Sequence, residues 1–220
     1  MTSTVYALHT GPVLVEVLKK LFQELLPQVR LVNVVDDGLL TDVRAAGALT
    51  PSLTRRVVGY GLLAEASGAD AILNCCSSVG EAADMLAGMV VIPVVKIDDR
   101  MSEIAVQTGT RIGVVATVAT TLDPTERLIQ RKAAALGKAV VTTRFLADSA
   151  FDALLAGDAQ QHDEIVKAEI ERAMRENDVV VLAQGSMARL VPQMQASSSV
   201  PLLSSPRLGV IALREHLGIA

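Results

Sequence analysis

Asp70-Ala-Ile-Leu-Asn-Cys-Cys-Ser-Ser78 decides the fold of this chain, because the same pattern returns as Asp178-Val-Val-Val-Leu-Ala-Gln-Gly-Ser186. In both copies a short apolar run follows an aspartate and ends in small polar residues, which is typical of a buried parallel strand that leads into a loop. Cys76 matches Gln184 in this alignment. The same spacing of 107 or 108 residues relates three further pairs, Ser78 with Ser186, Pro93 with Pro201 and Thr10 with Thr117. The repeat predicts two related lobes.

Around these stretches, short runs rich in β-branched residues alternate with longer amphipathic segments. The expected strands are Thr4–His9, Arg30–Val35, Asp70–Cys75, Val90–Val95, Arg111–Ala116, Ala139–Phe145, Asp178–Ala183 and Val200–Leu203. Helical spacing and end signals mark Val13–Leu25, Pro51–Gly68, Leu122–Leu136, Asp163–Arg175 and Arg207–Leu217. Alternating strands and helices predict an α/β fold with a mainly parallel, helix-covered sheet in each lobe. We expect the first lobe to span residues 1–100 plus 207–220 and the second to span residues 101–206.

The composition narrows the class of protein. Half of the 220 residues are hydrophobic, a fifth are charged, and the net charge is −4. This predicts a sizeable core and provides no basic surface for a nucleic acid or an anionic membrane. Aromatic residues make up 2% of the chain, so platforms for base stacking are not expected. No secretory signal pattern and no membrane-spanning apolar run is present, so we expect a cytoplasmic protein.

The ligand-binding residue types do not form a metal or nucleotide motif. The two cysteines are adjacent, Cys75 and Cys76, which excludes a disulfide framework and a CxxC site. The three histidines have no ligand spacing. No Gly-rich dinucleotide or phosphate loop is present. The sequence therefore predicts a protein without a metal and without a nucleotide cofactor.

Small polar residues follow four of the expected strands, at the carboxyl ends where open parallel sheets bind their ligands. These segments are His9-Thr10-Gly11, Cys76-Ser77-Ser78, Thr117-Val-Ala-Thr-Thr121 and Gln184-Gly-Ser186. The helix start after Cys76 offers backbone N–H groups and a partial positive charge, which favour both a thiolate and a carboxylate ligand. Cys76 is therefore the candidate reactive thiol, whereas Cys75 is expected to be a buried apolar residue on the opposite face of the strand. Serine and threonine at strand ends can equally be helix caps.

The other titratable residues favour structural interpretations. His9 can be a base or simply a polar strand end, and the second is favoured. His162 and His216 are expected to be solvated helix residues. The acidic pairs Asp36-Asp37 and Asp98-Asp99 are interpreted as solvated loop charges. Arg189 and Glu81 lie one turn into their helices, where they can reach a ligand but more often face solvent.

Four motifs in order resemble the Asp/Glu/hydantoin racemase superfamily, which includes maleate isomerase and arylmalonate decarboxylase. They are Gly68-Ala-Asp-Ala-Ile-Leu-Asn-Cys-Cys-Ser-Ser78, Val91-Ile-Pro-Val-Val95, Arg111-Ile-Gly-Val-Val-Ala-Thr117 and Val180-Val-Leu-Ala-Gln-Gly-Ser-Met187. The resemblance covers nearly the whole chain. It implies two pseudo-symmetric, flavodoxin-like lobes, an active site in the cleft between them, no metal, no organic cofactor and a homo-oligomer. The implied substrate is a small carboxylate, which Thr10, Ser77, Ser78, Thr117, Thr120, Gln184, Gly185 and Ser186 would bind.

The chain departs from this family at one position. The resemblance implies one catalytic cysteine per lobe; Cys76 matches the first, but Gln184 stands where the second is expected. Racemisation needs a proton carrier on each face of the substrate, and an amide only donates and accepts hydrogen bonds. Three reactions stay open for one thiol: racemisation with His9 or a water as second base, nucleophilic addition as in the isomerase, and decarboxylation of a malonate-type acid. The decarboxylase of the superfamily carries its single cysteine on the opposite lobe. A non-catalytic binder of a small acid is the remaining alternative.

Overall fold

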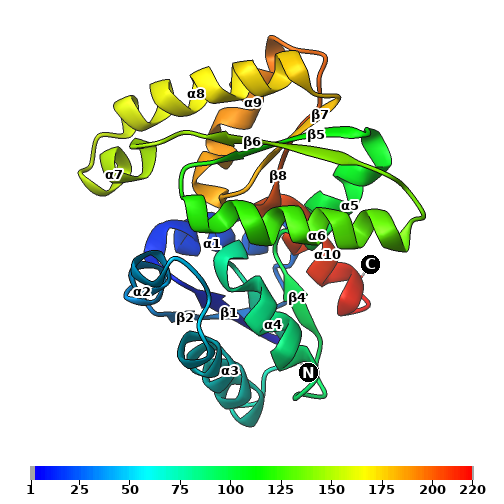
Figure 1. Ribbon diagram of the computed structural model, residues 1–220. Helices are drawn as coiled ribbons and strands as arrows, with labels where there is room; N and C mark the ends of the chain where they lie inside the picture. Colours follow the sequence, from blue (N-terminus) through cyan, green and yellow to red (C-terminus); the bar gives the residue numbers. More distant parts are fainter. Residues whose placement is uncertain (1–2, 220) are drawn as a thin grey trace. The chain divides into compact units, whose positions relative to one another are not determined.

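The computed structural model describes residues 3–219, which form two compact units, each built on its own parallel sheet (Figure 1). The first unit contains the residues up to Ile97 together with those from Pro206 onward, and the second contains Asp98–Ser205. Each sheet has four strands and is flanked by helices. The expectation of two flavodoxin-like α/β lobes is confirmed. No helix within residues 3–219 is long and apolar enough to cross a membrane.

The first sheet has the strand order β2-β1-β3-β4. Its strands are β1 (Thr4–His9), β2 (Arg30–Val35), β3 (Ala71–Asn74) and β4 (Val94–Lys96). All neighbours are parallel, so the four carboxyl ends lie at one edge of the sheet. β3 is central and completely buried, which agrees with its unbroken apolar sequence.

Helices cover both faces of the first sheet. They are α1 (Val15–Leu25), α2 (Leu39–Ala46), α3 (Pro51–Ala66), α4 (Gly80–Ala87) and α10 (Ser205–His216). Ala71 and Leu73 of β3 lie in one buried cluster with residues of α1 and α10, whereas Ile72 lies in a second cluster with residues of α3 and α4. Alternate residues of β3 therefore face opposite layers. Thr50 caps α3 by accepting a hydrogen bond from Leu53 N at 3.3 Å.

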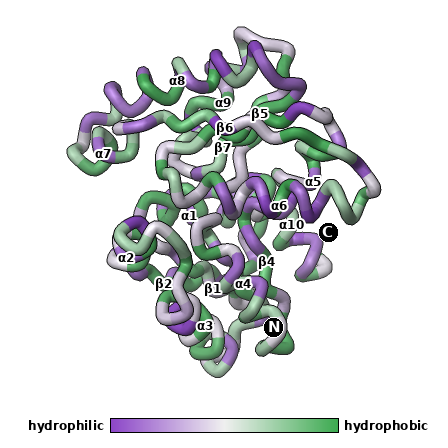
Figure 2. Tube along the Cα trace, in the orientation of Figure 1, coloured by the Kyte–Doolittle hydropathy of each residue, from purple (hydrophilic) through white to green (hydrophobic). Residues whose placement is uncertain are grey.

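The second sheet repeats this order as β6-β5-β7-β8. Its strands are β5 (Arg111–Ala116), β6 (Val141–Leu146), β7 (Val179–Leu182) and β8 (Leu202–Ser204), again all parallel. One face is covered by α7 (Ala150–Leu155), α8 (Ala159–Glu176) and α9 (Val191–Ala196). The helices α5 (Asp99–Thr108) and α6 (Leu122–Ala135) pack against each other and against β7 and β5. Hydrophilic and hydrophobic residues alternate along α8, as expected for a helix with one buried face (Figure 2).

In both halves of the chain, the helix that follows the fourth strand belongs to the other unit. β4 lies in the first sheet, but the next helix, α5, belongs to the second unit. β8 lies in the second sheet, and α10 returns to the core of the first unit. The repeat predicted from the sequence therefore extends to the connections as well as the strands.

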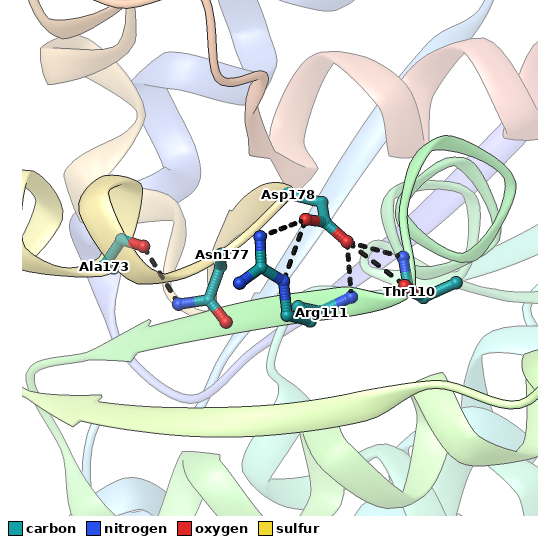
Figure 3. A network of polar contacts seen from close by, with 5 residues as sticks. All are labelled: Thr110, Arg111, Ala173, Asn177 and Asp178. Carbon is teal, nitrogen blue, oxygen red and sulfur yellow. Dashed lines mark hydrogen bonds and ion pairs between the residues drawn. The ribbon is translucent and has the colours of Figure 1, made fainter.

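An aspartate before the third strand binds the start of the first strand in each unit. Asp178 accepts hydrogen bonds from Thr110 N at 3.1 Å, from Arg111 N at 2.9 Å and from the Arg111 guanidinium at 2.7 Å (Figure 3). The Arg111 side chain, with these amides, holds the pKa of the Asp178 carboxyl well below its usual range. Asp70, the repeat counterpart, accepts from Thr4 N at 2.7 Å. These contacts fix the amino edges of the sheets, opposite the predicted site residues.

Several expected strands extend beyond the observed ones, and the largest difference is at β4. β4 covers Val94–Lys96 rather than Val90–Val95. Val91 is 96% exposed and forms a bend with Ile92, so the β-branched run reaches the sheet only after Pro93. β-Branched residues favour strands, but they do not fix where hydrogen-bonded pairing begins.

Candidate active site

Each of the four strand ends singled out from the sequence leads into a short 3₁₀ turn. These turns are η1 (Pro12–Leu14) after β1, η2 (Ser77–Val79) after β3, η3 (Ala119–Thr121) after β5 and η4 (Gly185–Leu190) after β7. β1 neighbours β3, and β5 neighbours β7, so each unit brings two of these turns to one sheet edge. Thr10 thus lies near Cys76, Ser77 and Ser78 in the first unit, and Thr117 and Thr120 lie near Gln184, Gly185 and Ser186 in the second.

Cys76 occupies the capping position of the helical segment that starts at η2. Its backbone is extended, with φ −140° and ψ 123°, and its side chain is half-buried against a cluster formed by α2, α3 and α4. Asn74, which is completely buried, donates through Nδ2 to the Cys76 carbonyl oxygen at 3.0 Å. This bond fixes the backbone at the thiol. Sequence reasoning missed Asn74, although a polar residue inside an apolar strand is a visible signal.

Cys75 has the buried environment that the strand periodicity predicts. It is 7% exposed and belongs to the buried cluster with α1 and α10, so it lies on the opposite face from Cys76. Its Sγ donates to Leu73 O at 3.4 Å. Burial, together with the charge of adjacent Cys76, raises the pKa of the Cys75 thiol well above its usual range. Cys75 is therefore a packing residue at neutral pH.

Gln184 has the same backbone position in the second unit. It caps η4 with φ −128° and ψ 139°. Its Oε1 accepts from Thr117 N at 2.8 Å, and its Nε2 donates to Thr121 Oγ1 at 3.3 Å. The amide therefore connects the end of β7 to the loop after β5.

Two threonine hydroxyls beside this bridge are buried without a hydrogen-bond partner among residues 3–219. They are Thr117 Oγ1 and Thr120 Oγ1, both in the loop after β5. A buried hydroxyl without a partner costs free energy, so both groups keep an unused hydrogen-bond donor. In the first unit, Thr10, Ser77 and Ser78 are all buried at the corresponding edge.

His9 is a buried strand end with one defined contact. Its side chain is 4% exposed, and its Nε2 lies 2.8 Å from Asn33 Oδ1 on β2. Since an amide oxygen only accepts, Nε2 carries the proton in this pair and Nδ1 keeps the lone pair of the neutral ring. Burial lowers the pKa of His9, and the Asn33 bond only partly opposes this. His9 is therefore held neutral in one tautomer, and a neutral imidazole can accept a proton.

Three titratable residues expected to be solvated are buried. His162 is completely buried, because α8 begins at Ala159, so the ring falls on its core-facing stripe. Asp36 is 9% exposed and accepts from Arg56 at 2.6 Å and from Tyr60 at 2.8 Å. Asp98 is 3% exposed at the start of α5. These predictions were wrong because tertiary packing, not local polarity, decides exposure. His216 is exposed, as expected.

No group of three or more His, Cys, Asp or Glu side chains within residues 3–219 is arranged to hold a metal ion. The polar groups at the four strand ends are instead a thiol, hydroxyls, an amide and helical backbone N–H groups. These groups suit an anionic ligand with oxygen acceptors.

Comparison with known proteins agrees with this arrangement. Residues 10–213 match the Asp/Glu/Hydantoin racemase family. The chain belongs to this family. The resemblance drawn from the four sequence motifs is thereby confirmed. No curated protein sequence matches the chain.

Solved structures of this family have the same fold. Allantoin racemase from Klebsiella pneumoniae is 17% identical, with a TM-score of 0.70, over 99% of this chain and 89% of that one. Aspartate racemase from Picrophilus torridus is 16% identical, with a TM-score of 0.74, over 98% and 94%. A mutant arylmalonate decarboxylase in a sulfate-associated form is 14% identical, with a TM-score of 0.63, over 98% and 93%. At these identities the likeness shows the fold alone.

Proposed function

We propose that this family member is an enzyme that acts at the carbon next to the carboxylate of a small acid, with Cys76 as its proton carrier or nucleophile and no metal or organic cofactor. The position of Cys76 carries the proposal: it is the half-buried thiol at a strand end, directly before a helical segment. The backbone N–H groups of such a segment stabilise a thiolate. Cys75 cannot share this role, because it packs in the core on the other face.

The surrounding donors support binding of a carboxylate. We assign this role to Thr10, Ser77 and Ser78 at one pair of strand ends, and to Thr117, Thr120, Gln184, Gly185 and Ser186 at the other. The two buried hydroxyls without partners, on Thr117 and Thr120, are the most specific support, since a carboxylate or enolate oxygen would accept from both. Preorganised donors of this kind stabilise developing negative charge, at about 3 kcal/mol for one donor.

The contacts of Gln184 favour chemistry on one face of the substrate. Both ends of its amide are engaged, with Thr117 N and Thr121 Oγ1, and an amide does not exchange a proton at neutral pH. Racemisation through two thiols is therefore not available. His9 is the alternative second base, because it is buried, neutral and held in one tautomer by Asn33.

The same observation supports decarboxylation as the second candidate reaction. In this reaction the bond between the α-carbon and one carboxylate breaks, CO₂ leaves, and the electron pair forms an enediolate. The Cys76 thiol then donates its proton to the α-carbon and regains one from water. Only one proton carrier is required, which agrees with the engaged amide at position 184.

A screen in D₂O tests these proposals. Aspartate, the substrate named for one of the relatives, would be incubated with the protein alongside glutamate and phenylmalonate. We expect deuterium uptake or loss of optical rotation for a racemase and release of CO₂ for a decarboxylase. Cys76→Ala is the inactive control and Cys75→Ala the matched active one. Binding of an acid without uptake, CO₂ or isomerisation would show a non-catalytic binder and contradict the enzyme proposal.

A further inference from the structure

A buried histidine lies beneath the segment that follows β7. His162 on α8 is completely buried, and its Nδ1 lies 2.9 Å from Asp163 Oδ1. Arg189 of η4 donates to Asp163 Oδ1 at 2.5 Å and to Ser186 O at 2.5 Å, and its Nη2 lies 3.2 Å from His162 Nδ1. The three side chains thus connect α8 to the backbone of Ser186.

The hydrogen-bond donors in this network can be assigned. A carboxylate only accepts, so His162 donates to Asp163 through Nδ1–H and Arg189 donates to the same oxygen. Nδ1 then has no lone pair for Arg189, and the 3.2 Å contact between Nη2 and Nδ1 is not a hydrogen bond. In the neutral ring Nε2 is an acceptor, and it is buried without a partner among residues 3–219. A buried polar atom without a partner destabilises the fold.

The repeat shows that packing alone does not require a histidine here. The buried face of α3 presents Leu53, Val57, Gly61 and Ala64, and the buried face of α8 presents His162, Val166, Ile170 and Ala173. Each residue of the first set precedes its counterpart by 109 positions. The first unit therefore fills this position with Leu53, an apolar residue. The second unit has an ionisable ring there and pairs it with a charged side chain on the segment after β7.

We propose that His162, Asp163 and Arg189 are positioning residues that hold Gly185 and Ser186 in the conformation that binds a carboxylate. The guanidinium is suited to this role, because its planar fork reaches Ser186 O and Asp163 together, which a single ammonium group does less well. His162 orients Asp163 through its Nδ1, which is the ring nitrogen that lies beside Arg189 and the segment after β7. This inference rests on the proposed carboxylate-binding role of Gly185 and Ser186.

Malonate titrated into the ¹⁵N-labelled full-length protein provides the test. We expect malonate to shift the amide signals of Gly185 and Ser186 and the Nδ1 signal of His162, because Nδ1 contacts Asp163 and Arg189. Arg189→Gln and His162→Leu should each weaken the apparent malonate affinity roughly tenfold, the scale of one charge-assisted hydrogen bond. Arg189→Lys should restore part of the loss. Arg175→Gln, on the exposed face of α8, is the matched control and should leave the malonate affinity unchanged.

The outcomes separate this inference from the proposed function. Circular dichroism identifies a variant that fails to fold, and Arg189→Gln, on a half-exposed side chain, keeps the test valid if His162→Leu is lost. Equal malonate affinity in wild type and both variants would overturn the inference. The inference would also be overturned if the amide signals of Gly185 and Ser186 in the wild-type protein did not shift with malonate. Turnover in the D₂O screen would then still support the enzyme, whereas a malonate response without turnover would support only the positioning network.

Discussion

The ends of β3 and β7 have the same backbone but different chemistry. Cys76 and Gln184 both cap a 3₁₀ turn in an extended conformation, with φ −140° and −128°. At the first end a thiol is half-buried before a helical segment, and at the second an amide binds the neighbouring loop. The repeat therefore preserves the scaffold and the capping position, whereas the side chain at that position differs between the units.

Buried polar residues also differ between corresponding positions of the two units. Asn74 fixes the carbonyl of Cys76 in the first unit, whereas its repeat counterpart in β7 is Leu182. His162 in the second unit has Leu53 as its counterpart. Even an ion pair is kept with its charges exchanged: Arg207 with Glu24 in one unit corresponds to Asp99 with Lys132 in the other, at distances of 2.6 and 2.7 Å. Each unit thus has its own polar contacts on a shared scaffold.

Replacing the two adjacent thiols should have the largest effect. We expect Cys76→Ala to reduce turnover by roughly 10²–10⁴-fold, because the general acid or nucleophile is removed. Cys75→Ala should lower stability but keep most of the activity, since that side chain only packs. Initial rates with the acid found in the D₂O screen measure the first effect, and thermal denaturation measures the second. Similar losses of rate in both variants would contradict the assigned facing of the two cysteines.

Restoring a thiol to the second unit would sharpen the comparison. Gln184→Cys should add α-proton exchange from the second face of the substrate, detected as deuterium uptake into both enantiomers. Gln184→Ser is the matched control, because it also removes the bridge to Thr117 N and Thr121 without supplying a thiol. Uptake that is equal in the two variants would show that the bridge, not the missing thiol, limits the reaction.

Alkylation distinguishes the two thiols without a substrate. Iodoacetamide should modify Cys76 at neutral pH and leave Cys75 unmodified, because Cys75 is buried and its pKa is raised by that burial and by the neighbouring charge. Only thiolates react, so Cys75 should stay protected as the pH rises to 9. Mass spectrometry of the peptide containing both residues, with Cys76→Ala as the reference, measures each rate. Faster modification of Cys75 than of Cys76 would contradict the assignment of Cys76 as the reactive thiol.

The sequence predicted the strands of the sheets and the capped start of α3 well, because these depend on local periodicity and capping chemistry. The repeat of Asp70–Ser78 gave the two-unit architecture. The exposure and the partners of polar side chains were harder to predict. Exposure of Asp36 depends on Arg56, twenty positions away, and that of His162 depends on where α8 begins. The bridge from Gln184 to Thr117 joins residues 67 positions apart. Such contacts come from tertiary packing, and a single sequence contains no local signal for them.

The aspartates at the amino edges give the last and smallest test of the comparison. Asp178 binds Thr110 and Arg111, including a guanidinium, whereas Asp70 accepts from Thr4 N. We expect Asp178→Asn to lower the melting temperature at pH 7 more than Asp70→Asn does. The pKa of Asp178 is lower in the folded than in the unfolded chain, so the unfolded state binds more protons in acid.

The stabilisation from Asp178 is therefore complete above the unfolded carboxyl pKa of about 4 and is lost as the pH falls toward the folded value. The difference in melting temperature between wild type and Asp178→Asn should shrink between pH 7 and pH 3. Scanning calorimetry at both values measures it. A difference that stays constant with pH would mean that the ionisation of Asp178 does not contribute to the stabilisation. In that case the ion pair with Arg111 would not distinguish the two amino edges, and the asymmetry of the units would be confined to their carboxyl ends.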